Sequence, residues 1–283
     1  MNLFFIVMFS TASAWKCTGH MLVALIAELS LISQDPKAYS EASLITSFIN
    51  NNITSSSAQT FVESACWADD LKTQNITLYN PYHYFDMPYF PSTHFNITLP
   101  SENILSAWNT IKPYLKSTSF DLDPLKSSIF LRFLLHLAGD IHQPMHCISL
   151  FSEEFPEGDL GGTLFEVTFK GSTQLHLFWD TGAGLWDRDF SRPLSGEDRR
   201  SLLDIARGIM KEWPESYYEN ELSQEDIEKW CEEGYEIAVK EGYGELKLFE
   251  ELSEEYLAKA QRTVRERIAL GGYRLARTIS TLY

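Results

Sequence analysis

The chain has 283 residues and a formal net charge of −16 at neutral pH, with 39 Asp and Glu residues against 23 Lys and Arg. This charge excludes a protein that holds nucleic acid by a broad basic surface, and the hydrophobic content of 44% is typical of a globular domain. After the first residues no run reaches the roughly 18 apolar residues of a transmembrane helix, so we expect no membrane span. No repeat or Pro/Ser-rich linker divides the chain, which favours a single domain.

The first predicted element is a secretory signal peptide over residues 1–14. Residues 3–9 are apolar, and Ala12-Ser13-Ala14 has the A-x-A form of a cleavage site. Cleavage would leave Trp15 with a free α-amino group, whose ordinary pKa is about 8. This amine and the Trp15 carbonyl oxygen could chelate a metal ion, with His20 one helical turn further on. The alternative is that Trp15 is only a buried aromatic residue.

A cleaved signal peptide implies a secreted protein, or one in the lumen of an acidic secretory or lysosome-like compartment. Three N-x-T sequons, at Asn52, Asn75 and Asn96, are potential glycosylation sites on exposed turns. Such a compartment is oxidising, so an even number of cysteines predicts two disulfides in one of three connectivities. The four cysteines are Cys17, Cys66, Cys147 and Cys231.

Helical signals dominate the rest of the chain, so we expect a mainly α fold. Helices are predicted to open at Asp35-Pro36, at Ser101-Glu102 and at the capping-box sequences that begin with Ser195 and Ser223. A long amphipathic helix is predicted from Ser253 to about Leu282. The one clear β signal covers residues 163–177, where two alternating runs flank Lys170-Gly171-Ser172 and predict a small hairpin.

The segment from Phe130 to Cys147 (FLRFLLHLAGDIHQPMHC) carries the strongest signal for a site. His136 and Asp140 stand four residues apart, on one face of a helix, at the separation that two ligands of one metal ion require. Pro144 is expected to end or bend that helix and to direct His146 toward a second ion. A lone histidine on an apolar helix is usually a core or cap residue, and we expect this role for His142.

Other segments supply further candidate ligands. His176 and Asp180 also stand four apart, at a predicted junction of strand and helix that could present both to one ion. Asp69 and His83 are single candidates, and each could instead be structural, as an N-cap or a core histidine. The full candidate set is the Trp15 amine, His20, Asp69, His83, His136, Asp140, His146, His176 and Asp180. This set uses five of the seven histidines and leaves out His94 and His142.

In this order, these residues resemble the secreted zinc-dependent single-strand-specific nucleases with 3′-nucleotidase activity, the fungal and plant class I nucleases related to bacterial phospholipase C. The matching motifs are W-x-x-x-G-H, W-A-D, H-Y-F-D, H-x-x-G-D-x-H-Q-P-x-H and L-H-x-x-W-D, in chain order. Two positions depart from the family pattern: Thr163 replaces the Asn of G-G-N, and Gln174 replaces the Asn of N-L-H. Both departures concern base preference and hydrogen bonds around the ligands, not the ligands themselves.

The resemblance implies a helical single domain with a trinuclear zinc cluster. Asp69, His83, His136 and Asp140 would hold one zinc ion, Trp15 and His20 a second that shares Asp140, and His146, His176 and Asp180 the third. The implied activity is endonucleolytic hydrolysis of single-stranded DNA and RNA to products with 5′-phosphates, together with hydrolysis of 3′-nucleotides. The implied chemistry is attack on phosphorus by a zinc-activated hydroxide.

The resemblance also assigns roles to four residues. Asp69 would orient the attacking water, and Lys72 would neutralise charge on the phosphorane, although a solvated helix lysine is an equal alternative. Tyr84 would stack on an unpaired base, which accounts for single-strand preference, unless it is a core residue. Asp86 would accept hydrogen bonds from base N–H groups. The competing functions are a phospholipase C that acts on lipid phosphodiesters and a non-catalytic secreted zinc-binding protein, and in each case we expect a monomer.

Overall fold

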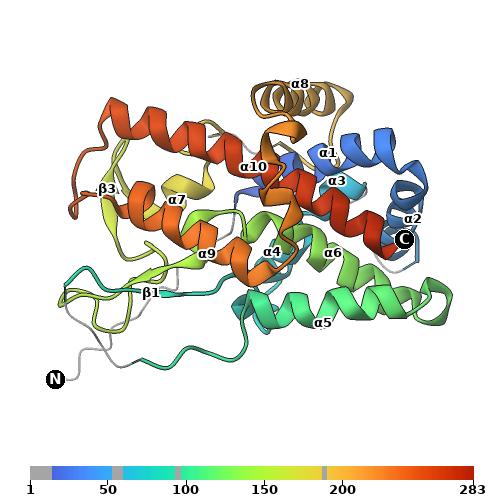
Figure 1. The fold of residues 1–283 in the computed structure, drawn as a ribbon, viewed down its shortest axis with the longest axis horizontal. Coiled ribbons are helices and arrows are strands. Elements are labelled where there is room, and N and C mark those ends of the chain that lie inside the picture. Colours follow the sequence, from blue (N-terminus) through green and yellow to red (C-terminus); the bar gives the residue numbers. More distant parts are fainter. Residues whose placement is uncertain (1–14, 53–59, 93–96, 187–189) are drawn as a thin grey trace.

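The structure is a computed structural model that describes residues 15–52, 60–92, 97–186 and 190–283 (Figure 1). The predicted signal peptide and His94 lie outside the described residues, and the sequons at Asn52 and Asn96 lie partly outside them. The sequon at Asn75 is described, and Asn75 and Thr77 are both exposed, as expected for a sequon on a turn.

The described residues are mainly helical, as predicted. The α-helices are α1 (Cys17–Gln34), α2 (Pro36–Asn52), α3 (Phe61–Ser64), α4 (Trp67–Thr73), α5 (Ile104–Ser117), α6 (Pro124–Asp140), α7 (Leu175–Asp180), α8 (Gly196–Glu212), α9 (Ile227–Ile237) and α10 (Glu254–Leu282). The short helices are η1 (Asn80–His83), η2 (Phe120–Leu122), η3 (Pro144–Cys147), η4 (Glu215–Tyr218), η5 (Glu221–Ser223) and η6 (Ala238–Tyr243), of which η6 is a π-helix.

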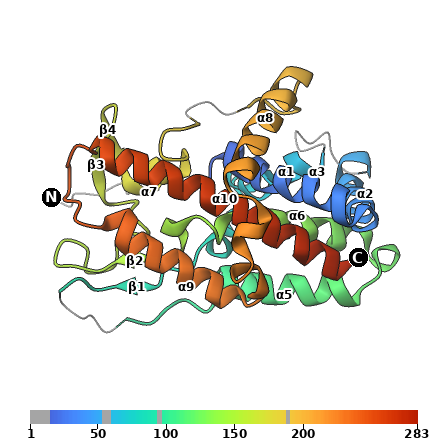
Figure 2. The same cartoon turned by 45° about the horizontal axis from the view of Figure 1, so that its top comes forward.

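Helix α1 lies in the core of the protein. It packs most extensively against α10, and it also contacts α6, α3 and α8. Figures 1 and 2 show α10 running along the length of the molecule, with α9 beside it. The close approach of α1 to α10 depends on Gly272, because a Cβ there would lie 2.5 Å from the Cγ2 of Ile26. Among the described residues, α1 alone is long and apolar enough to cross a membrane by length and composition, but 72% of it is buried inside the protein.

The predicted helix starts are confirmed in part. Asp35, Ser195 and Ser253 precede α2, α8 and α10, and each accepts a hydrogen bond from a backbone N–H of the first turn. The prediction at Ser223 was three residues early, because Asp226 caps α9 through the N–H of Glu228. The prediction at Ser101 was two residues early. Asn103 caps α5 instead, and its side chain accepts from the N–H of Ser106.

The predicted hairpin is present, with shorter strands than the sequence pattern suggested. Strands β3 (Glu166–Thr168) and β4 (Ser172–Gln174) pair antiparallel, with Val167 opposite Thr173. The turn places Lys170 and Gly171 at positive φ, 53° and 118°. The expectation of a single β element was wrong, because β1 (Pro88–Tyr89) and β2 (Ser149–Leu150) form a second, parallel pair. This pair joins the segment after His83 to the segment after His146.

The cysteines confirm one predicted disulfide of two. Cys17 at the start of α1 is bonded to Cys66, at a sequence separation of 49. Cys147 and Cys231 are buried free thiols, so the expectation of a second disulfide was wrong for this structure. Burial and the adjacent Cys147 thiol raise the pKa of Cys231, which keeps it protonated at neutral pH.

Candidate metal centre

The end of α6 and the turn after it carry three of the predicted ligands. α6 ends at Asp140, and Pro144 begins η3. Between them Gln143 is extended, with φ −87° and ψ 113°, because a residue before proline avoids helical geometry. The chain turns there, so His146 is presented from η3 while His136 and Asp140 are presented from α6. The predicted break in the helix is therefore confirmed.

The structure brings the predicted His and Asp ligands together in three groups, within each of which the possible ligand atoms lie within 4.8 Å of one another. The first group is Asp69, His83 and His136, the second is His20, His136 and Asp140, and the third is His146, His176 and Asp180. The contributing elements are α1, α4, η1, α6, η3 and α7. Such a site is assembled only by the tertiary fold, because no single element carries more than two of these side chains.

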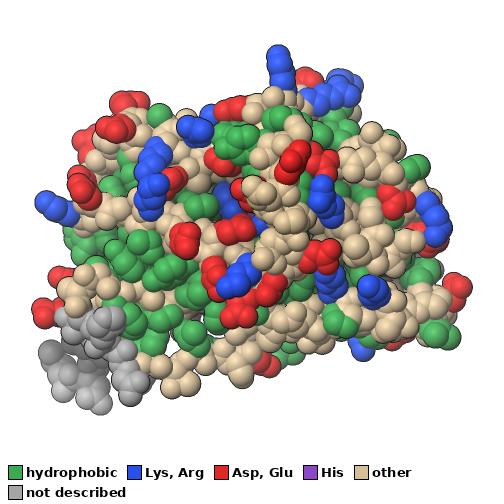
Figure 3. All heavy atoms as spheres, in the orientation of Figure 1, with side chains coloured by type: hydrophobic (Ala, Val, Ile, Leu, Met, Phe, Trp, Pro, Cys, Tyr) green, Lys and Arg blue, Asp and Glu red, His purple; other side chains and the backbone are tan. Residues whose placement is uncertain are grey.

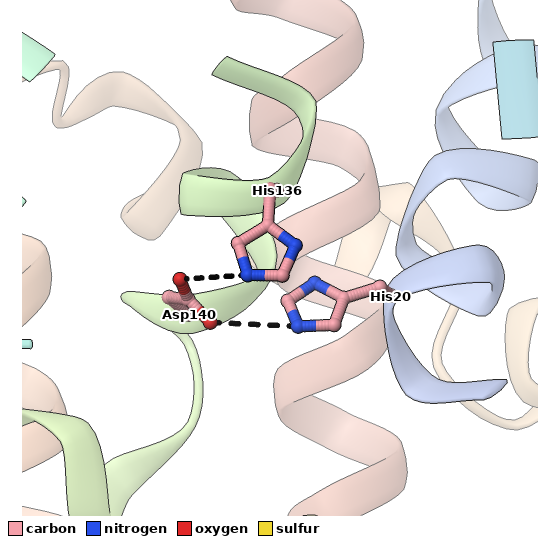
Figure 4. A group of neighbouring side chains, drawn as sticks. All are labelled: His20, His136 and Asp140. Atoms are coloured by element: carbon pink, nitrogen blue, oxygen red, sulfur yellow. Dashed lines mark ion pairs between the residues drawn. The ribbon is translucent and has the colours of Figure 1, made fainter. Parts of the chain in front are cut away.

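Asp140 faces ligands of more than one group. Its Oδ2 atom lies 3.0 Å from His83 Nδ1 and 3.2 Å from His136 Nε2, while its Oδ1 atom lies 3.4 Å from His20 Nε2. Figure 4 shows the His20 and His136 rings against each other, both directed at this carboxylate. Burial opposes ionisation, but the neighbouring His136 and His83 hold the pKa of Asp140 well below its usual value. Asp140 is therefore an ionised carboxylate whose two oxygens face possible ligands of two different groups.

Backbone carbonyl groups orient three of the histidine rings. The Nδ1 atoms of His136, His146 and His176 lie 2.6, 2.7 and 2.8 Å from the carbonyl oxygens of Ala65, His83 and Gly161, respectively. A carbonyl oxygen only accepts, so each Nδ1 carries the proton and each Nε2 presents a lone pair. This is the arrangement in which a second hydrogen bond fixes the tautomer of a metal-binding histidine.

Two of the buried imidazoles, those of His83 and His176, are neutral in the folded protein at neutral pH. Burial and the nearby Lys72 lower the pKa of His83 to about 4. Burial and the nearby His146 lower the pKa of His176 to about 3. Neutral imidazole is the form that binds a metal ion, so neither ring must lose a proton at neutral pH before it can act as a ligand.

Several buried polar atoms in these groups have no hydrogen-bond partner in the described part of the chain. They are both ring nitrogens of His20, Oδ1 of Asp140 and Oδ2 of Asp180. An unsatisfied buried polar group costs about 1–3 kcal/mol, more when it is charged, and the cost disappears when the atom coordinates a cation. Imidazole nitrogen and carboxylate oxygen together suit zinc. The donor set and the unsatisfied atoms therefore fit the zinc ions that the resemblance implies.

Gly139 makes the packing of His20 possible. A Cβ at position 139 would lie 2.4 Å from His20 Nδ1, so any side chain there would displace the ring. The carbonyl oxygen of Gly139 also accepts a hydrogen bond of 2.9 Å from the indole Nε1 of Trp15, which is fully buried. The sequence pattern singled out Asp140 and passed over Gly139, because a glycine within a helix has no side-chain chemistry to detect.

The segment that begins at Trp15 is attached to three parts of the protein. The Trp15 indole is bonded to Gly139, and the N–H of Lys16 donates to the carbonyl oxygen of Asp180 at 2.9 Å. Cys17 is bonded to Cys66. Trp15 is therefore buried beside the ligand groups, and these attachments hold its backbone close to them.

Asp69 and Lys72 form an ion pair at the edge of the first group. Lys72 Nζ lies 2.8 Å from Asp69 Oδ1, and only 8% of the Lys72 side chain is exposed. Lys72 is therefore not the solvated helix lysine that was the alternative. Burial opposes ionisation of Asp69, but His136, Lys72 and His83 together lower its pKa. Asp69 is the least buried of the His and Asp ligands, so it is the one that solvent reaches most easily.

Tyr84 and Asp86 follow His83 in the chain, directly after the end of η1. Tyr84 is 36% exposed, so it is not the core residue that was the alternative. Asp86 is half-buried, and burial together with the nearby Asp159 raises its pKa to about 7. Near neutral pH the Asp86 carboxyl group can therefore either accept or donate a hydrogen bond.

Three further residues, His142, Thr163 and Gln143, complete the surroundings of the site. His142 is a core residue, as expected: its Nδ1 donates to the Ala138 carbonyl oxygen, and its Nε2 accepts from Arg274. The departure from the family pattern at Thr163 leaves His176 oriented, because the acceptor for its ring is the backbone carbonyl of Gly161.

Sequence reasoning missed Gln143, whose Nε2 donates to Asp180 Oδ1. Its signals were its place beside Pro144 and the Q of the H-Q-P-x-H motif, but neither gave it a role.

The fold and the three groups define a mainly helical protein with a buried, carboxylate-linked set of possible metal ligands. The chain belongs to the S1/P1 nuclease family, whose model matches residues 15–283. S1/P1 nucleases are metal-dependent, in agreement with these groups.

Curated relatives carry nuclease names. The chain is 31% identical to Endonuclease 1 of Arabidopsis thaliana over 54% of its length and 49% of that protein. It is 30% identical to Nuclease S1 of Aspergillus oryzae over 59% of its length and 53% of that protein. It is 24% identical to Endonuclease 2 of Arabidopsis thaliana, over 95% of this chain and 90% of the relative. The first two alignments therefore span about half the length of those relatives.

Proposed function

We propose that this protein is a secreted, monomeric, zinc-dependent nuclease that hydrolyses single-stranded DNA and RNA to 5′-phosphorylated products and also hydrolyses 3′-nucleotides. The observation that carries the proposal is Asp140, whose two oxygens face the ligands of adjacent groups. A carboxylate shared in this way places two metal ions close together, which is the arrangement used for displacement at phosphorus. The family match over residues 15–283 supports the substrate class.

We propose that the site holds three zinc ions. Asp69, His83, His136 and Asp140 would hold one, the Trp15 amine and carbonyl with His20 and Asp140 the second, and His146, His176 and Asp180 the third. Zinc at these positions would supply a Lewis acid for the phosphate and a nucleophile at neutral pH, since the metal lowers the pKa of bound water to about 7. The ions would also explain how an acidic protein attracts a phosphate.

In this proposal the protein residues around the ions position the water and the substrate. Asp69 is held ionised by its charged neighbours, so it can accept a hydrogen bond from the attacking water and fix its orientation. Lys72 carries a positive charge 2.8 Å from Asp69, where it can offset negative charge that develops on the phosphate oxygens.

Tyr84 and Asp86 would select the substrate. The exposed face of Tyr84 can stack on a base only if that base is not stacked within a duplex, which makes the enzyme prefer single strands. Asp86, two residues further on, would form hydrogen bonds with the edge of the stacked base. On the face that Figure 3 shows, acidic and basic side chains are interspersed.

The test uses protein that begins at Trp15. We expect it to release 5′-mononucleotides from single-stranded DNA, to act much more slowly on duplex DNA and to lose activity when zinc is chelated. Asp69→Asn, which removes both a proposed ligand and the acceptor for the attacking water, should lose most of the activity. Hydrolysis of phosphatidylcholine without nucleotide release would replace the proposal by a phospholipase C, and zinc binding without either activity would replace it by a zinc-binding role.

A further inference from the structure

Gln143 contacts three of the segments that form the metal centre. Its backbone N–H donates to the carbonyl oxygen of Asp140 at 2.9 Å, and its backbone carbonyl accepts from the N–H of His146 at 3.0 Å. Its side chain donates from Nε2 to Asp180 Oδ1 at 2.6 Å. The residue is fully buried, so water does not compete for these contacts.

The orientation of the Gln143 amide is determined by its partners. The side-chain Oε1 atom lies 2.6 Å from the backbone nitrogen of Met145, a donor, and Nε2 lies beside a carboxylate, an acceptor. The reverse orientation of the amide would place a donor against a donor and an acceptor against an acceptor. Of the ordinary side chains of this length, only glutamine supplies both hydrogen bonds without a change in protonation.

The contact with Gln143 leaves the two oxygens of Asp180 in different situations. Oδ1 accepts from Gln143, while Oδ2 has no hydrogen-bond partner among the described residues and lies 3.4 Å from His176 Nε2. Oδ1 lies 3.8 Å from His146 Nε2, so Gln143 holds the oxygen on the His146 side and leaves the oxygen on the His176 side without a hydrogen-bond partner among the described residues. The backbone carbonyl of Asp180 accepts from the N–H of Lys16, so hydrogen bonds hold both the backbone and the side chain of Asp180.

We propose that Gln143 is a positioning residue for the third group, which holds Asp180 by Oδ1 so that its carboxylate keeps the orientation that presents Oδ2 beside His176. The inference rests on the proposed metal centre. In proteins, loss of a hydrogen bond that orients a metal ligand typically weakens metal binding by about 10–100-fold. We expect loss of the Gln143 hydrogen bond to weaken the binding of one of the three proposed zinc ions, the one that the third group would hold.

Two substitutions separate this role from a purely structural one. Gln143→Glu keeps an acceptor for the Met145 N–H, and so keeps the start of η3, but it removes the donor to Asp180 and adds a negative charge. Gln143→Met has a similar volume and removes both contacts. A matched control is Gln261→Glu, since Gln261 also donates one hydrogen bond, to the Ala183 carbonyl oxygen at 3.1 Å.

The measurement is the number of zinc ions retained per protein as free zinc is lowered with a buffered chelator, together with the melting temperature of the metal-free protein. We expect both Gln143 variants to release one zinc ion at roughly 10–100-fold higher free zinc than the parent does, and Gln261→Glu to behave like the parent. An effect in Gln143→Met alone would assign the role to the turn and overturn the proposal. Unchanged zinc retention in both, or failure of both to fold, would also overturn it.

This experiment distinguishes the inference from the proposed function. If the parent protein retains no zinc, the metal centre itself is refuted. If the parent retains three ions and the Gln143 variants retain them equally well, only the role of Gln143 is refuted.

Discussion

The Nε2 atoms of His146 and His176 lie 3.2 Å apart and face each other. Both rings donate their Nδ1 protons to backbone carbonyls, so two lone pairs are directed at one another. This contact is unfavourable unless a cation lies near both nitrogens.

Removal of metal should therefore destabilise the protein. Zinc at a free concentration about 1,000-fold above its dissociation constant stabilises the folded state by about 4 kcal/mol per site, and the opposed lone pairs add to the difference. We expect chelation to lower the melting temperature of the parent, and to lower it less in His176→Ala, which loses a ligand and one of the two lone pairs. Equal shifts for the parent and the variant would contradict this account.

An extension before Trp15 should remove one zinc ion. A preceding peptide bond converts the α-amino group into an amide, which is a poor ligand, while the Trp15 indole can still bond to Gly139. We expect a protein with one extra residue before Trp15 to lose one zinc ion and to be at least roughly 100-fold less active. Elemental analysis and nuclease assays of the two forms, with the same residues elsewhere, provide the measurement, and full activity of the extended form would exclude the Trp15 amine as a ligand.

Lys72 should affect turnover more than substrate binding. Replacement by Met removes the charge beside Asp69, so we expect kcat to fall by roughly 10–100-fold while zinc content is unchanged. Lys72→Arg should recover part of the loss because it restores the charge. Lys112→Met provides a control for the loss of one positive charge away from the site. A normal kcat in Lys72→Met would leave the ion pair with a structural role only.

Asp86 should make base preference depend on pH. Its pKa of about 7 means that it changes from donor to acceptor between about pH 6 and 8, so the ratio of kcat/KM values for different homopolymers should change over this range. In Asp86→Asn the ratio should be constant with pH. Use of a ratio removes effects of pH on zinc binding, which act on all substrates alike.

The Asp86 carboxyl group should also make the free energy of unfolding fall as the pH rises. The raised pKa means that between about pH 4 and 7 folded Asp86 binds a proton that unfolded Asp86 does not. Its contribution to the free energy of unfolding is present below pH 4 and is lost as the pH rises through 7. Metal-free Asp86→Asn should therefore gain stability relative to the parent on going from pH 5 to pH 8. A difference that is independent of pH would show that the pKa of Asp86 is not raised.

The disulfide should make a large contribution to stability. Cys17 and Cys66 close a loop of 49 residues, for which chain entropy predicts about 4 kcal/mol. We expect Cys66→Ser to lower the free energy of unfolding by about this amount, and Cys231→Ala to have a smaller effect. Thiol titration of the unfolded, unreduced protein should find two thiols. A value of zero would indicate a bond between Cys147 and Cys231.

The sequence predicted those parts of the site that depend on local spacing. His136 and Asp140 share a helix face, as do His176 and Asp180, so their separation alone indicated a common ion. Asp69 and His83 have no such partner nearby, and only the resemblance to a family connected them to the rest. The burial of Lys72 depends on the fold around α4, which no local pattern encodes.

Local sequence patterns likewise predicted only part of the fold. The long helix α10 was predicted at both ends, because its cap and its periodicity extend over many residues. The pairing of β1 with β2 involves two residues in each strand, too few for an alternating pattern to appear. The hydrogen bond from Gln143 to Asp180 spans 37 residues, and no local rule predicts it.

Gly139 would be prominent in any survey of substitutions scored by activity. Because the space for its Cβ is filled by His20, replacement even by alanine should be as harmful as replacement of a ligand. A mutational scan would then rank this residue with the catalytic groups, although it contributes no functional group of its own. In this protein, whether a substitution is tolerated depends on the space around the ligands as well as on the chemistry of the ligands themselves.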